Sequence, residues 1–125
     1  MTLARTMRRN PEQQLHIAVA QYLNLALPER SFWTTIPSGG GGRVRGALLK
    51  AMGLRRGVPD LMVIQGGRCA FIELKAPGKH PTLEQRDCHD DIKNAGAWVF
   101  VCRSIEDVER LLRSAQFQVC GKVVT

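Results

Sequence analysis

Residues 59–75 read PDLMVIQGGRCAFIELK, and this stretch decides the fold. Residues 60–64 begin with an acid and continue with four apolar side chains, which predicts a buried strand. Residues 65–68 contain two adjacent glycines and predict a tight turn, because glycine readily adopts the backbone angles of hairpin turns. Residues 69–75 predict a second strand, so the two runs form an antiparallel hairpin.

Helical and strand patterns surround this hairpin. Asn10 and Pro11 predict a helix start, and Pro28 ends that helix. Thr82 with Gln85 forms the capping-box pattern of a later helix start. The other predicted elements are a strand at 31–36, helices at 44–52, at 82–95 and from 104, a strand at 97–102 that is central and buried on both faces, and an edge strand at 117–124.

The length of 125 residues, with 44% hydrophobic and 23% charged residues, is typical of one folded domain. We expect a basic flexible arm at residues 1–9 and a single α/β domain at residues 10–125, with a central mixed β-sheet flanked by helices. No apolar run approaches the ~20 residues that span a bilayer, so we expect no membrane partner. The four cysteines form no CxxC pair, which favours reduced thiols and a cytoplasmic location.

The net charge of +7 is distributed unevenly along the chain. Residues 1–57 carry nine Lys and Arg against two acids, whereas residues 58–125 carry nine of each. All the excess positive charge therefore lies in the N-terminal half. This asymmetry favours a polyanionic partner, with nucleic acid as the first candidate. The alternative is a solvated surface that keeps a small protein soluble.

Polar residues with catalytic potential lie in the hairpin. Glu73 and Lys75 project from the same face of their strand, and burying both costs free energy unless they pair or serve a ligand. Asp60 begins the preceding strand, so hairpin pairing predicts that it lies nearly opposite Glu73. Two carboxylates at that spacing repel unless a cation lies between them, and oxygen ligands favour Mg²⁺ or Mn²⁺ over zinc. The alternative for Glu73 and Lys75 is an ion pair on an edge strand.

The spacing of these residues resembles the signature of the PD-(D/E)xK nuclease superfamily, in which Pro-Asp is followed by Glu-x-Lys. Further positions resemble the VRR-NUC family, which includes small nuclease domains of phages and bacteria. The positions that carry this resemblance are Glu12, the glycine-rich loop ending in Arg43, Gly57-Val58-Pro59-Asp60, Ile72-Glu73-Leu74-Lys75 and Gln85. The resemblance extends from about residue 10 to about residue 110. It implies a restriction-endonuclease-like fold and a Mg²⁺-dependent DNA endonuclease, with Mn²⁺ as a substitute.

The resemblance also implies a set of metal ligands. Asp60 and Glu73 would bind the catalytic Mg²⁺, helped by the backbone carbonyl of Leu74. Glu12 would be an additional carboxylate on the metal side, although an acid in the first turn of a helix is also favoured by the helix dipole.

Two further residues would act on the water that attacks the phosphodiester. Lys75 is similar to the family's lysine that positions or activates this water. Gln85 matches a polar residue that braces the lysine or the water, and by itself it also fits a capping role. In some related nucleases an aromatic residue follows this glutamine by one helical turn. His89 takes that place here, and no role is carried over to it.

Basic residues beside the motif are candidates for binding DNA phosphates. The glycines at 39–42 predict a flexible strap through which backbone amides and nearby arginines approach a phosphate. The alternative for each arginine is a solvated position. The DNA-binding candidates are Arg43, Arg45, Arg55, Arg56 and Lys79. The spacing of His80, Cys88 and His89 matches no zinc site, so we expect solvated histidines and a semi-buried thiol.

A chain this small offers little surface for reading bases. We therefore expect structure-directed cutting of branched DNA, such as four-way (Holliday) junctions or flaps, in replication, recombination or DNA repair. The resemblance implies a homodimer in the cytoplasm of a bacterial or phage-infected cell, and paired sites suit symmetric nicking. One alternative is a catalytically idle nucleic-acid-binding module on the same fold. A weaker one is a metal-independent ribonuclease of the tRNA-processing type.

Overall fold

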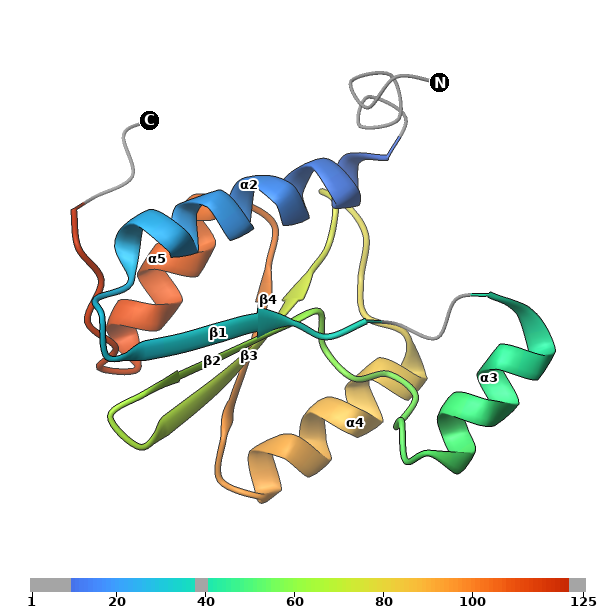
Figure 1. Cartoon of the computed structure of the whole chain (residues 1–125). Coiled ribbons are helices and arrows are strands. Elements are labelled where there is room, and N and C mark those ends of the chain that lie inside the picture. Colours follow the sequence, from blue (N-terminus) through green and yellow to red (C-terminus); the bar gives the residue numbers. More distant parts are fainter. Residues whose placement is uncertain (1–9, 38–40, 122–125) are drawn as a thin grey trace.

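The computed structural model describes residues 10–37 and 41–121. Within these ranges helices and strands follow one another as Figure 1 shows. In chain order they are α2 (Pro11–Ala26), β1 (Ser31–Thr35), α3 (Gly42–Ala51), β2 (Leu61–Gln65), β3 (Arg68–Leu74), α4 (Leu83–Asn94), β4 (Trp98–Cys102) and α5 (Ile105–Ser114). The predicted basic arm lies outside the described residues. None of the described helices is both long enough and apolar enough to cross a membrane.

The strands form one mixed sheet in the order β1-β2-β3-β4. β2 runs antiparallel to both β1 and β3, whereas β4 runs parallel to β3. The hairpin turn pairs Gln65 with Arg68, and the same register pairs Leu61 with Ile72. A parallel pair needs a crossover connection, and α4 supplies it. The predicted hairpin and the predicted α/β fold with a mixed sheet are confirmed.

Different helices cover the two faces of the sheet. α2 and α5 pack together on one face, and α4 lies against the other (Figure 1). Leu61, Val63 and Ile72 point toward α2 and α5, where they are fully buried with Leu23 in the hydrophobic core. Because side chains alternate along a strand, Glu73 points to the opposite face, toward α4.

The predicted helix starts at Asn10 and Thr82 are confirmed. The Asn10 side chain accepts a hydrogen bond from the Gln13 backbone N–H at 3.1 Å, which satisfies one amide of the first turn of α2. Thr82 and Gln85 form the reciprocal capping box of α4. The helix predicted at 44–52 begins slightly earlier, at Gly42, after Gly41 in a left-handed conformation with φ 100°.

The prediction of a central strand at 97–102 was wrong. β4 lies at the edge of the described sheet and pairs with β3 alone. Phe100 and Cys102 are buried, but the side chain of Trp98 remains 39% exposed. A continuous apolar run is compatible with either position, because its hydrophobic pattern does not reveal how many neighbours a strand has.

The predicted edge strand at 117–124 was also wrong in its described part. Residues 117–121 form no strand, and residues 122–125 lie outside the described ranges. Side chains hold this segment in place: the Gln118 backbone N–H donates to Gln65 Oε1, and Phe117 packs edge-on against Trp98 with ring centroids 6.0 Å apart. Burial of Phe117 and Val119 in the core accounts for the apolar pattern that favoured a strand.

Candidate active site

The β2–β3 hairpin brings Asp60 and Glu73 together, as predicted. The register that pairs Leu61 with Ile72 places Asp60 opposite Glu73 at the next position. Asp60 Oδ2 accepts a hydrogen bond from the Leu74 backbone N–H at 2.7 Å, which fixes the carboxylate beside β3. The Asp60 backbone carbonyl accepts a hydrogen bond from the Ile36 backbone N–H at 2.7 Å, so the residue that follows β1 fixes the Asp60 backbone.

Glu73 is a buried acid with only 2% of its surface exposed. Burial raises its pKa to about 9, and a hydrogen bond with Asp60 and the charge of Asp60 add to the effect. The positive charge of Lys75 acts in the opposite direction. The two carboxyl groups are therefore held close enough to share a proton. A divalent cation could replace that proton, because its charge would offset the repulsion between two carboxylates.

The Leu74 carbonyl is suitably placed to join this pair. In a β-strand the N–H and C=O of one residue point to the same side of the chain. The Leu74 N–H points to Asp60, so the Leu74 carbonyl also faces that side of β3. Two carboxylates and a carbonyl form an oxygen-only donor set that fits Mg²⁺ or Mn²⁺.

Glu12 reaches the same end of β3 from the first turn of α2. Its Oε1 accepts a hydrogen bond from the Ala76 backbone N–H at 3.3 Å, and its charge contributes to raising the pKa of Glu73. In the described part of the chain, no three His, Cys, Asp or Glu side chains form a cluster that could hold a metal ion. Glu12 therefore lies near the acidic pair without completing a three-carboxylate cluster.

Lys75 lies at the end of β3, where its backbone N–H donates to the Cys102 carbonyl at 3.0 Å. The side chain is largely buried and close enough to Glu73 to lower the pKa of that acid. An ammonium group beside two carboxylates partly offsets their charge. The predicted common orientation of Glu73 and Lys75 agrees with this electrostatic contact.

Gln85 combines a capping role with a place in the lining of a cleft that Asp60 also lines. Its side-chain Oε1 accepts from the Thr82 backbone N–H at 2.8 Å, which confirms the capping role. Gly57 lies against this turn of α4: a Cβ on Gly57 would lie 2.9 Å from the Gln85 Cα. This close packing fixes the start of α4 beside the segment that leads into β2.

His89 is a site residue to which the sequence assigned no role. Its Nε2 lies 3.3 Å from Glu73 Oε1, and 4% of the residue is exposed. The expectation of a solvated histidine was therefore wrong, and Cys88 is also buried rather than semi-buried. Burial and then the charge of Lys93 lower the pKa of His89, which favours a neutral imidazole. The sequence feature that could have placed His89 in the site is its position one helical turn after Gln85, on the same face of the helix.

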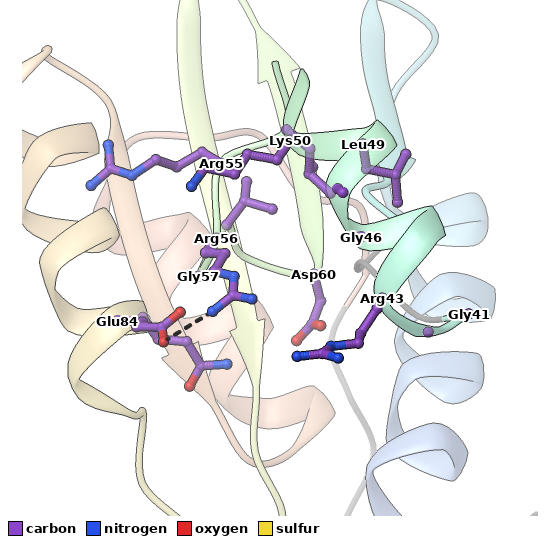
Figure 2. Close-up of a pocket in the computed structure, with 15 residues that line it drawn as sticks. Gly41, Arg43, Gly46, Leu49, Lys50, Arg55, Arg56, Gly57, Asp60 and Glu84 are labelled. Carbon is purple, nitrogen blue, oxygen red and sulfur yellow. Dashed lines mark ion pairs between the residues drawn. The ribbon is translucent and has the colours of Figure 1, made fainter. Parts of the chain in front are cut away.

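A cleft of about 980 Å³ opens beside Asp60, between α3 and the start of α4 (Figure 2). Its lining includes three of the predicted DNA-binding residues, Arg43, Arg55 and Arg56. Lys50 also lines it and was missed, although it lies seven residues after Arg43 and therefore on the same helical face. In Figure 2 the side chain of Arg43 extends from α3 toward Asp60.

The other two predicted DNA-binding residues do not line this cleft. Arg45 is exposed on α3, and its side chain packs over Gly41 at the rim. Lys79 is exposed in the loop before α4. Arg55 and Arg56, which do line the cleft, form ion pairs with acids of α4: Arg55 with Asp91 at 2.7 Å and Arg56 with Glu84 at 3.8 Å. These pairs are exposed, so both arginines remain accessible to a polyanion.

Comparisons with known proteins identify the family and the fold of the chain. The family model described as the VRR-NUC domain matches residues 3–106. A solved structure described as a VRR_NUC domain protein is similar, with a TM-score of 0.67 and 18% identity over 82% of this chain and 85% of that chain. A second, described as a VRR_NUC domain, has a TM-score of 0.55 and 23% identity over 82% of this chain and 94% of that chain. No curated protein matches the chain significantly.

At these identities the two solved structures establish the fold, and the family model establishes the family. The class is a nuclease domain with the restriction-endonuclease-like fold of the PD-(D/E)xK superfamily. Within that class, the chain belongs to the VRR-NUC family.

Proposed function

We propose that this protein is a Mg²⁺-dependent endonuclease that hydrolyses DNA phosphodiester bonds. The observation that carries the proposal is the pairing of the buried Glu73 with the half-buried Asp60 beside a cation-lined cleft. A paired acid this deep in a strand has no structural necessity, since apolar residues would fill the same space at lower cost.

Asp60, Glu73 and the Leu74 carbonyl would hold Mg²⁺, with Mn²⁺ as a substitute. A metal bound there would polarise the phosphodiester and lower the pKa of a water molecule. Side chains of the protein would position the attacking water. Lys75 would orient the attacking water beside the pair, and Glu12 would add a further carboxylate on the metal side.

The cleft would hold the DNA backbone. Arg43, Lys50, Arg55 and Arg56 line it, and phosphate contacts of this kind position a strand without reading its sequence. Arg45 at the rim and Lys79 in the neighbouring loop would extend the contact beyond the cleft.

We further propose that the preferred substrate is branched DNA, such as a four-way junction or a flap, and that the working unit is a homodimer in the cytoplasm. A single cleft can engage one strand, whereas two clefts related by a two-fold axis could nick opposite strands of a symmetric junction. Sedimentation of the full chain, alone and with a four-way junction, tests this stoichiometry.

The direct test is cleavage of end-labelled four-way junction, flap, single-stranded and linear duplex DNA in Mg²⁺, Mn²⁺ and EDTA. Glu73→Gln removes one member of the acidic pair. Glu84→Gln is its matched control, because Glu84 is an exposed acid of the same cleft. Metal-dependent cutting that is lost in Glu73→Gln and kept in Glu84→Gln supports the nuclease. Tight binding without cutting of any substrate would instead favour the idle binding module.

A further inference from the structure

His89 contacts Glu73, the buried member of the acidic pair. Its Nε2 lies 3.3 Å from Glu73 Oε1, and both side chains are almost completely buried. Glu73 is also hydrogen-bonded to Asp60. The Glu73 carboxyl group is therefore held between a partner from α4 and a partner from the entrance of β2.

A glutamate side chain has three rotatable bonds, and an unrestrained carboxyl group would lose orientational freedom on binding a cation. The His89 contact removes that freedom in advance. The imidazole is anchored in turn, because it is buried on the face of α4 that packs against the sheet and α4 is fixed at its start by the capping box.

We infer that His89 is a positioning residue that donates its Nε2–H to Glu73 and holds the Glu73 carboxylate toward Asp60 for a divalent cation. This inference rests on the proposed function. It assigns to His89 a role in metal affinity through Glu73 and no contact with the metal or the DNA.

Space filling is the competing explanation, and the choice of variants separates the two. His89→Leu retains an apolar side chain of comparable size but removes the donor. His89→Gln retains an N–H donor at about the distance of Nε2, whereas His89→Asn carries the same amide on a shorter side chain. If His89 positions Glu73, His89→Gln should keep the metal affinity, and His89→Leu and His89→Asn should lose it. If His89 only fills space, His89→Leu should bind metal at least as tightly as His89→Gln.

The experiment measures Mn²⁺ binding to the full-length protein by electron paramagnetic resonance, without DNA. Loss of a hydrogen-bond partner of a metal ligand typically weakens metal affinity by 10–100-fold, so we expect a rise in Kd of about that size for His89→Leu and His89→Asn. We expect His89→Gln to stay within about threefold of wild type, since its donor is retained. Cys88→Ala, a change at the buried neighbour on α4, is the control and should leave the Kd unchanged.

The result is independent of cleavage. If wild type binds Mn²⁺ but cuts no DNA, the proposed nuclease fails while the affinity series still decides the role of His89. Equal Mn²⁺ affinity of His89→Leu and wild type would overturn the inference, as would a His89→Gln variant that binds as weakly as His89→Asn. If His89→Leu does not fold, the Gln and Asn pair alone gives the decision, because both carry the same polar group.

Discussion

Gly57 lies so close to the backbone of Glu84 that a Cβ at Gly57 would be 2.4 Å from the Glu84 carbonyl oxygen. The contact joins the segment before β2, which carries Asp60, to the first turn of α4, which carries Gln85. Neither segment can shift independently at this point. The segment that carries Asp60 can pack this closely against α4 only because residue 57 has no side chain.

Gly57→Ala should destabilise the fold. Alanine at φ +82° is strained, and its methyl group would overlap α4 backbone, which cannot move aside as a flexible side chain would. We expect a loss of about 2–4 kcal/mol in the free energy of unfolding, measured in urea. Gly78→Ala is the control, because it has a similar φ of +80° and no atom within 4 Å of the added Cβ. It should cost about 1 kcal/mol from strain alone, and equal losses for the two variants would contradict the packing argument.

Asp60→Asn should separate cutting from binding. The change removes one charge from the acidic pair, and the loss of a metal ligand should reduce cleavage by at least about 100-fold. Binding should be kept or strengthened, because a negative charge facing the DNA backbone is removed while the cleft arginines remain. Fluorescence anisotropy with a labelled junction in Ca²⁺ measures binding. A parallel loss of binding and cutting would place Asp60 in the DNA interface instead.

Glu73 should make the stability of the metal-free protein fall as pH rises. Its pKa is raised from 4.5 in an ordinary environment to about 9 in the fold, with burial as the main cause. Between these two values the folded state holds a proton that the unfolded chain has released. The free energy of unfolding therefore decreases from about pH 5 to pH 9. Urea unfolding in EDTA at several pH values tests this. Glu73→Gln has no carboxyl group to titrate at this position. If its free energy of unfolding falls with pH as steeply as that of wild type, Glu73 is not the cause of the pH dependence.

Arg55→Ala combined with Arg56→Ala should weaken DNA binding and flatten its dependence on salt. Each phosphate contact contributes about 0.9 to the slope of log affinity against log salt concentration, so the slope should fall by up to about 1.8. The charge-matched control is Arg30→Ala with Arg68→Ala, two exposed arginines beside the hairpin turn, at the other end of β2 from Asp60. A slope that changes equally in both double variants would place the DNA elsewhere.

The hairpin was predictable because its signals are local. A run of apolar residues, two adjacent glycines and a second apolar run determine the register, and the register determines that Asp60 faces Glu73. The capping residues of α2 and α4 were predictable for the same reason, since each cap involves residues only three positions apart. The motif therefore predicted correctly that Asp60 and Glu73 lie opposite each other, and the roles assigned to its residues remain predictions.

Features that depend on distant segments were not predictable. The edge position of β4 depends on which strands pair, and the apolar sequence of residues 98–102 would be the same in a central strand. Burial of His89 depends on α4 packing over β3, which no local pattern specifies. The basic cleft likewise forms only when α3 lies opposite the start of α4, which explains why Lys50 was missed and why Arg45 and Lys79 were grouped with the cleft residues.

The capping box has a consequence for the chemistry of the cleft. A capping box accepts glutamate as well as glutamine at its third position, so helix formation does not explain why residue 85 is an amide. The Gln85 oxygen is turned back to the Thr82 N–H, and an amide fixed in this way presents its NH₂ group in the other direction, where it can only donate. Glutamate would cap α4 equally well but would add a negative charge to a cleft whose arginines and lysine suit DNA phosphates. Gln85 therefore caps α4 as glutamate would, while leaving the cleft without a further negative charge.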